Sequence, residues 1–237
     1  MLLGACADTE VPTDPTHTLR STSATAAGVR KYDVTISNLT GSQPLSPGVV
    51  VTHTKHVEVW APGRQASEGI RQIAENGEDA PAVVELSGAP GVFDVVGTGL
   101  PPVHRIGGPG PTSRTFRITA RGDANRLSVA VMLICTNDGF TGVHGVRLPG
   151  GFQPAMFTGQ GYDAGTESND QSSTHIVDPC GEIGPVPAPP DGQNLRTPTP
   201  GGLIHLHPGI QPGVGDLSAT AHDWVNPTVR IAVQRVR

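Results

Sequence analysis

Glycine and proline interrupt this chain so often that they restrict the folds open to it. Its 237 residues include 31 glycines and 23 prolines, together about twice the ordinary usage. Both residues disfavour long helices, because glycine loses much backbone freedom on folding and proline lacks a backbone N–H. Apolar residues nevertheless recur in short runs that are rich in valine and isoleucine. This combination predicts short strands joined by turns and irregular loops.

Alternating apolar residues predict where the strands lie. In residues 31–38, Tyr32, Val34 and Ile36 alternate with polar residues, as in a half-buried strand. Similar patterns predict further strands in residues 49–56, 82–86, 92–96, 115–120, 127–135, 203–207 and 228–236. We therefore expect an all-β domain, most simply an antiparallel sandwich of two sheets.

Two segments depart from the strand pattern. In residues 65–76, Ile70 and Ile73 fall on one face of a helix, and Gly77 supplies a stop signal. Residues 179–200 hold seven prolines without an apolar period. Proline cannot donate to a sheet ladder, so these patterns predict one short helix and one long surface loop.

The charge balance excludes nucleic-acid binding. The chain carries 16 Lys and Arg against 21 Asp and Glu, a net charge of −5, and its basic residues are scattered. Binding to nucleic acid needs clustered Lys and Arg that neutralise phosphates. We expect no nucleic-acid partner.

The N-terminal residues resemble a bacterial lipobox, in which a cysteine after small residues is lipidated. We expect residues 1–6 to be the remainder of a lipoprotein signal with Cys6 lipidated, and the Thr/Ser/Ala-rich residues 7–30 to be a flexible tether for a domain at 31–237. The alternative is a chance cysteine, because five residues cannot form the charged and apolar parts of a signal peptide. The expected location is the cell envelope, periplasmic or on the cell surface, or the medium. Any membrane contact would be made through this anchor, since no stretch approaches 18 apolar residues.

The remaining two cysteines are expected to pair. An exported protein enters an oxidising compartment, where Cys135 and Cys180 would form a disulfide. Closing this loop would stabilise the fold by about 4 kcal/mol in the chain-entropy model. The alternative is two buried free thiols. No CxxC spacing points to a structural zinc site.

Acidic residues gather in two glycine-containing segments. Asp138 follows the strongest apolar strand, and Asp163 and Glu167 flank the flexible pair Ala164-Gly165. Three carboxylates could converge on one hard cation, and Ca²⁺ takes six to eight oxygen ligands. Acidic residues are equally typical of solvated turns. Spacing alone leaves both interpretations open.

Three motifs resemble, in order, the signatures of the spondin N-terminal domain family. They are SVAVMLICTNDGFTGV at residues 128–143, YDAGTE at 162–167 and HDWVNP at 222–227. The segments YDVTISNLT, PLSPGVVVTHT and ASEGIRQIAENG resemble the bacterial branch of the family, so the likeness covers residues 31–237. The resemblance, to the domain found in F-spondin and mindin, implies a C2-like antiparallel β-sandwich.

The resemblance also implies calcium. In the family that the chain resembles, the aspartate after the strand and two acidic residues of the DAGT motif hold a calcium ion at one end of the sandwich. These positions correspond to Asp138, Asp163 and Glu167. The chain departs from the family at two places, because Glu167 stands where animal members typically have Asp and residues 137–139 read Asn-Asp-Gly in place of Pro-Asp-Trp.

Three histidines offer an alternative metal site. His205 and His207 alternate along the strand predicted at residues 203–207, and His222 follows at a turn. Three imidazoles on one side could bind Zn²⁺ or Cu²⁺. The alternative is that His207 and His222 form hydrogen bonds that fix the loop before the last strand. Trp224 is more typical of a core or sheet-edge anchor than of a ligand platform.

Residues 121–123 spell Arg-Gly-Asp, the integrin-recognition tripeptide. A glycine between two predicted strands is typical of a polar turn, because glycine adopts positive φ without strain. The turn therefore accounts for these residues without a role in adhesion.

The sequence favours a binding module over an enzyme. It contains no G-x-S-x-G elbow, H-E-x-x-H pair or P-loop. We expect an exported, envelope-anchored binding or structural module, in which calcium orders loops at one end that contact an envelope or extracellular ligand. A periplasmic transition-metal-binding protein that uses the three histidines is the alternative. A hydrolase on the same scaffold is a third possibility.

Overall fold

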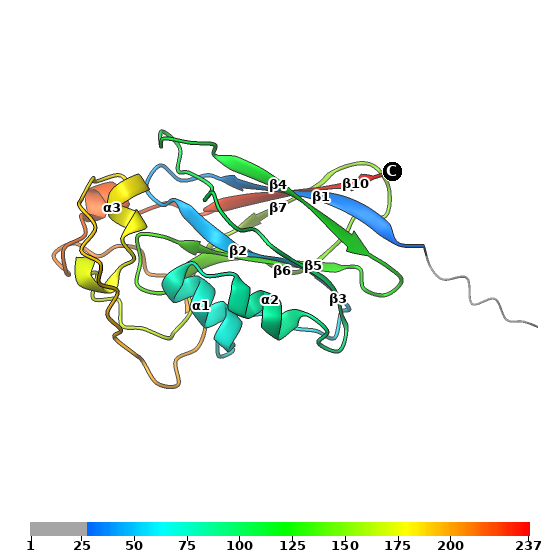
Figure 1. The fold of residues 1–237 in the computed structure, drawn as a ribbon, viewed down its shortest axis with the longest axis horizontal. Coiled ribbons are helices and arrows are strands. Elements are labelled where there is room, and N and C mark those ends of the chain that lie inside the picture. The colour runs from blue at the N-terminus through cyan, green and yellow to red at the C-terminus, as the bar shows by residue number, and fades with distance from the viewer. Residues whose placement is uncertain (1–27) are drawn as a thin grey trace, which may run out of the picture.

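Two antiparallel sheets packed face to face make up the body of the protein (Figure 1). The structure, a computed structural model, describes residues 28–237. Strands follow the order β4-β1-β10-β7 in the four-stranded sheet and β3-β2-β5-β6-β8-β9 in the six-stranded sheet. The strands are β1 (Arg30–Asn38), β2 (Leu45–His53), β3 (Val92–Gly97), β4 (Ser113–Ala120), β5 (Arg126–Leu133), β6 (Gly139–Arg147), β7 (Ala155–Gly159), β8 (Gly161–Asp163), β9 (His205–Leu206) and β10 (Val229–Val236). The expected all-β sandwich is confirmed.

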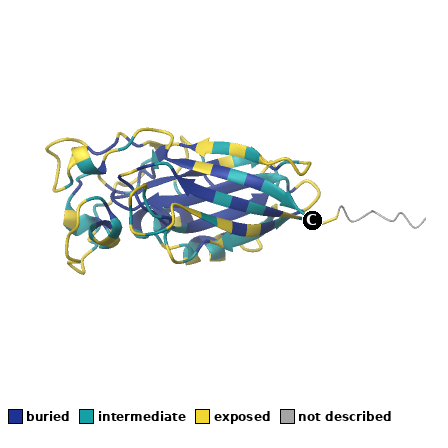
Figure 2. Ribbon diagram, turned by 90° about the horizontal axis from the view of Figure 1, so that it is seen from above, coloured by how far each residue is buried: buried dark blue, intermediate teal, exposed yellow. Residues whose placement is uncertain are grey.

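Alternation along the strands separates two apolar cores. On β1, Val34 and Ile36 are fully buried between the sheets, whereas the intervening residues are less buried. On β2, Val50 faces the same inner core, and Val49 and Val51 point to the opposite side of the six-stranded sheet. Helices cover that outer side, so the middle strands β2 and β5 are buried on both faces. Figure 2 shows the buried residues along the middle of the strands.

A pair of helices covers the outer face of the six-stranded sheet (Figure 1). Helix α1 (Glu68–Asn76) begins where the Ser67 hydroxyl accepts a hydrogen bond from the Ile70 N–H, and it ends at Gly77, whose φ is 66°. The helix and stop predicted for this segment are therefore confirmed. The remaining helices are α2 (Ala80–Leu86), α3 (Pro179–Ile183), α4 (Ala219–His222) and the short 3₁₀ helix η1 (Ser173–His175).

The strand predicted for residues 82–86 is wrong, because this segment forms helix α2. A proline stands in the first turn of the helix, where its missing N–H has no partner to lose. Ala82 and Leu86 are four residues apart and are both buried in the outer core, as a helix in contact with α1 requires. The short apolar run therefore fits either period, and tertiary contact with α1 decides between them.

Strand β6 lies in a glycine-containing segment that carries no strand pattern. Here Gly142 pairs with Ala130 of β5. A Cβ atom on Gly142 would come within 1.8 Å of the Val129 carbonyl oxygen, so the glycine permits a backbone approach that no other residue allows. The strand is hard to predict from the sequence because its glycine is required by the close approach of the β5 backbone, and its residues do not alternate between apolar and polar.

The predicted disulfide is present between Cys135 and Cys180. It joins the chain just after β5 to helix α3 and lies in a small apolar cluster with Ile134 and Ile176. The proline-rich segment that was expected to be a surface loop therefore begins with a helix that is covalently fixed to the six-stranded sheet.

The chain enters and leaves the sandwich at the same end. Near the start of β1, Lys31 pairs with Val236 of β10, beside the C-terminus. Cys135, α3 and the ends of β1 and β5 lie at the opposite end, which we call the distal end (Figure 1). Cys6 and most of the predicted tether lie outside the described residues. Within residues 28–237, none of the helices has the length and apolar character that crossing a bilayer requires.

Replacement of both bridging cysteines by alanine should lower the free energy of unfolding. Loop closure over 45 residues of sequence predicts a loss of up to about 4 kcal/mol. Urea denaturation of the double variant and of the oxidised protein measures the difference. A free energy of unfolding that is the same in both proteins would contradict a stabilising role for the bridge.

Candidate functional site

Sheet register brings two of the predicted acidic residues together at the distal end. Strand β6 pairs with β8 so that Gly139 stands opposite Asp163, and Asp138 immediately precedes that pair. Glu167 follows four residues after Asp163. All three carboxylates are buried, with exposed fractions of 0, 1 and 3 % in chain order. The site is therefore an enclosed acidic cluster at the rim of the sheet.

Asp138 organises the segment that carries Glu167. Its Oδ2 atom accepts hydrogen bonds from the backbone N–H groups of Thr166, at 2.7 Å, and Glu167, at 2.9 Å. Its other oxygen, Oδ1, is buried and has no hydrogen-bond partner within residues 28–237. Oδ2 thus fixes the loop through hydrogen bonds, and Oδ1 is available to a ligand.

The other two carboxylates divide their oxygens differently. Glu167 accepts a hydrogen bond from the Thr197 N–H on Oε1, at 3.2 Å, whereas its Oε2 is buried and lacks a partner in the described part of the chain. Asp163 uses both oxygens, which accept from the Gly165 N–H at 2.7 Å and the Asn169 amide at 2.5 Å. In the part of the chain that the structure describes, two buried carboxylate oxygens, one on Asp138 and one on Glu167, are therefore without a donor.

Burial makes the charged forms of these groups costly. Burial and the neighbouring Asp163 carboxylate raise the pKa of Asp138 to about 6. Burial likewise raises the pKa of Glu167 to about 7, against the opposing effects of the Thr197 N–H and Arg196. Unpartnered carboxylate oxygens in a negative pocket are the donor set that a hard divalent cation prefers. The residues present therefore fit calcium in donor type and charge.

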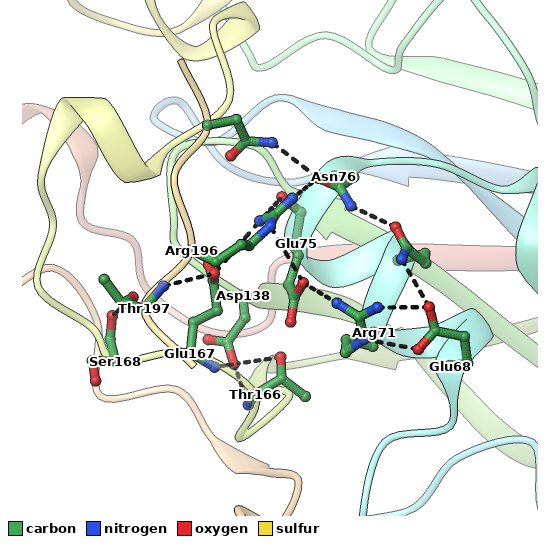
Figure 3. Close-up of polar contacts among 12 residues, drawn as sticks. Glu68, Arg71, Glu75, Asn76, Asp138, Thr166, Glu167, Ser168, Arg196 and Thr197 are labelled. Atoms are coloured by element: carbon green, nitrogen blue, oxygen red, sulfur yellow. Dashed lines mark hydrogen bonds and ion pairs between the residues drawn. The ribbon is translucent and has the colours of Figure 1, made fainter. Parts of the chain in front are cut away.

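An arginine that the sequence analysis missed links the acidic cluster to helix α1 (Figure 3). Arg196 lies 3.5 Å from Glu167 Oε1 and 3.7 Å from Glu75 Oε2. It also donates to the side-chain oxygen of Asn76 at the end of the helix. Glu75 is 3 % exposed and is paired as well with Arg71. No sequence signal marks this link, because 121 residues separate Arg196 from Glu75 in a proline-rich segment without a motif.

The structure does not gather the three histidines. His205 is exposed and its Nδ1 lies 2.9 Å from the Leu203 carbonyl. His207 is buried, and its Nδ1 accepts from the Gly209 N–H at 3.0 Å. Burial lowers the pKa of His207 to about 4. His222 lies instead beside the disulfide, with Nδ1 3.1 Å from the Ser218 carbonyl.

Neither predicted metal site brings three ligand atoms close together in the described part of the chain. Among residues 28–237, only Cys135, Cys180 and His222 place one ligand atom each within 4.8 Å of one another. These two cysteines form the disulfide and offer no thiolate. The three carboxylates of the acidic cluster and the three imidazoles are therefore both spaced more widely than this limit. Within residues 28–237 the acidic cluster has two buried ligand atoms without a hydrogen-bond partner, Asp138 Oδ1 and Glu167 Oε2, whereas the histidines have one, His207 Nε2.

Two other sequence features have structural roles. Residues 121–123 form the turn between β4 and β5, with Gly122 at a φ of 54°, as predicted. Trp224 packs on the His207 ring at 5.0 Å and against the inner core.

A buried serine–histidine pair also has a structural role. The Ser128 hydroxyl lies 2.8 Å from His53 Nε2 and accepts from the Gly145 N–H, so it connects β2, β5 and β6. Both side chains are 1 % exposed.

Replacement of Asp138 by Asn should stabilise the metal-free protein at neutral pH. The folded state holds the Asp138 proton more tightly than the unfolded chain, so this carboxyl lowers stability as the pH rises from about 4 through about 6. Asp138→Asn removes that penalty and should raise the free energy of unfolding by on the order of 2 kcal/mol at pH 7.5, and by much less at pH 4.5. Urea denaturation in metal-free buffer measures both values.

The matched control is Asp123→Asn, which changes an exposed aspartate in the β4–β5 turn at the other end. It should have little effect at either pH. Destabilisation by Asp138→Asn at pH 7.5, or an effect of equal size at both pH values, would contradict the assignment.

Comparison with known proteins identifies the family of the chain. The Spondin_N family matches residues 40–183, a span that includes Asp138, Asp163 and Glu167. No curated protein matches the chain. Because the match covers more than half of the sequence and the observed fold is an antiparallel sandwich, the chain belongs to the Spondin_N family.

Proposed function

We propose that this protein is an exported binding module of the cell envelope, whose acidic cluster takes up calcium and thereby orders the distal loops. The observation that carries the proposal is the pair of buried oxygens that find no donor among residues 28–237, Asp138 Oδ1 and Glu167 Oε2. Leaving such oxygens unpaired costs free energy, which a cation would offset. Membership of the family and a disulfide both fit an extracellular or exported module.

The acidic cluster would connect three parts of the chain. Asp138 belongs to the β5–β6 turn, Glu167 to the segment after β8, and Arg196 to the segment before β9. A bound calcium ion would supply positive charge between carboxylates that otherwise repel one another. Asp138 would continue to fix the Glu167 backbone, and Arg196 would continue to join this loop to α1.

The proposed orientation follows from the two ends of the sandwich. If residues 7–30 tether the domain to a lipidated Cys6, the tether joins the sandwich beside the C-terminus. The acidic cluster and the loops around it then face away from the membrane. A ligand would meet the distal end first.

Calcium should raise the thermal midpoint of the full chain. At a calcium concentration about a hundred times Kd, linkage predicts a gain of about 2.7 kcal/mol, equivalent to about 5 to 10 °C for a chain of this length. Asp163→Ala should lose most of this difference, because it removes a buried carboxylate from the site. Melts of both proteins in calcium and in chelator measure it.

Asp123→Ala serves as the control and should keep the full calcium response. Zn²⁺ and Cu²⁺ form separate arms of the same experiment. A midpoint of Asp163→Ala that rises with calcium as far as that of the unaltered protein would refute the site. A response to Zn²⁺ or Cu²⁺ alone would move the function to the histidines.

A further inference from the structure

An apolar groove lies at the distal end, beside the acidic cluster. Its volume is about 610 Å³, which is within the range of sites that bind small ligands or peptide side chains. It is bounded by the end of α1, by the segment between β3 and β4, and by α3. Six of the residues that line it are Pro47, Leu100, Met132, Ile134, Val177 and Ile183.

One side chain of the groove projects into solvent. Leu100 is 78 % exposed, although an exposed leucine next to an apolar concavity adds nothing to folding. The Arg114 guanidinium donates to the Gly99 carbonyl at 2.7 Å and also to the carbonyl of Pro101. The segment is thus held in place with Leu100 pointing outward. A fixed apolar side chain at a rim is suited to cover a bound segment.

The charges at the groove have one sign. Glu78, Asp79 and Glu182 all line it, and His104 is the only basic residue among its lining residues. None of these three carboxylates forms an ion pair within residues 28–237. Asp79 accepts a hydrogen bond from the Gly99 N–H at 2.8 Å. An apolar floor edged by carboxylates that have no cationic partner in the described chain is complementary to a ligand that places a cation beside an apolar group. Anionic ligands would be repelled.

We propose that this groove docks a short polypeptide segment of a partner protein, in which apolar side chains are flanked by Lys or Arg. The apolar side chains would fill the space over Met132 and Ile134, and the cations would meet Glu78 and Glu182. The three chain segments that bound the groove leave it open at the surface, as an extended peptide requires. Such a peptide would be the partner of the proposed binding module, so the assignment of the groove rests on the proposed binding function but not on calcium.

The groove is also connected to the acidic cluster. Asn76, which lines the groove, accepts a hydrogen bond from the Asn194 amide at 2.9 Å and another from Arg196. Arg196 in turn faces Glu167. Docking and the acidic cluster therefore share the segment around residues 194–196, and peptide affinity is best measured in calcium and in chelator.

Selection from a phage-displayed library of random twelve-residue peptides on the immobilised full chain tests the proposal. The expected result is a consensus of apolar residues flanked by Lys or Arg. No enrichment, or a consensus that is acidic or lacks basic residues, would overturn it. Fluorescence anisotropy with the labelled consensus peptide then measures Kd for variants of the groove.

Exposed residues provide variants that should leave the fold intact. Leu100→Ser should weaken binding about tenfold, through loss of apolar contact, and the double variant Glu78→Lys, Glu182→Lys should weaken it at least as much. Met156→Ser removes an exposed apolar side chain of β7 that does not line the groove, since Met156 is 67 % exposed, and Asp123→Lys reverses a distant charge. Both controls should bind normally. Equal losses in groove variants and controls would refute the groove as the site.

Peptide selection and thermal melts on the same protein samples test the groove and the calcium site separately. Absence of selected peptides from a protein whose melt responds to calcium would overturn the groove alone. Peptide binding by a protein without a calcium response would overturn the calcium site alone.

Discussion

Buried negative charge at the rim of the six-stranded sheet constrains the whole distal end of this protein. Asp138 is fully buried, and a carboxylate there must be satisfied by donors, by a cation or by protonation. One of its oxygens is satisfied by the Thr166 and Glu167 backbone, which fixes that loop. The other oxygen has no donor in the described chain and, with Glu167 Oε2, leaves the site incomplete without a cation or a proton.

Two connections hold the segments around this site in place. The disulfide fixes α3 to the end of β5, and Arg196 joins the segment before β9 to Glu75 and Asn76 of α1. Long loops that would otherwise be free are thereby held over the sheet. The apolar groove lies between the same elements, so the features that support the acidic cluster also shape a surface that faces away from the chain termini.

Local patterns in the sequence predicted much of the fold, and the family resemblance pointed to the carboxylates of the candidate site. Val34 and Ile36 reveal β1 through alternation, and Ser67 and Gly77 delimit α1 through capping. Residues 82–86 misled because a short apolar run fits a strand as well as a helix, and contact with α1 decides the outcome. Strand β6 could not be predicted from alternation, because Gly142 is required by the close approach of the β5 backbone. Arg196 could not be found, since its partners are distant in sequence and no motif surrounds it.

Calorimetric titration of calcium into the metal-free full chain at pH 6.5, in two buffers of different ionisation enthalpy, tests the central claim most directly. The raised pKa values of Asp138 and Glu167 predict that binding releases protons, so the observed enthalpy should depend on the buffer. We expect one calcium ion per chain, proton release, and loss of both in Asp138→Asn. Absence of saturable binding, or unchanged binding by Asp138→Asn, would contradict the account.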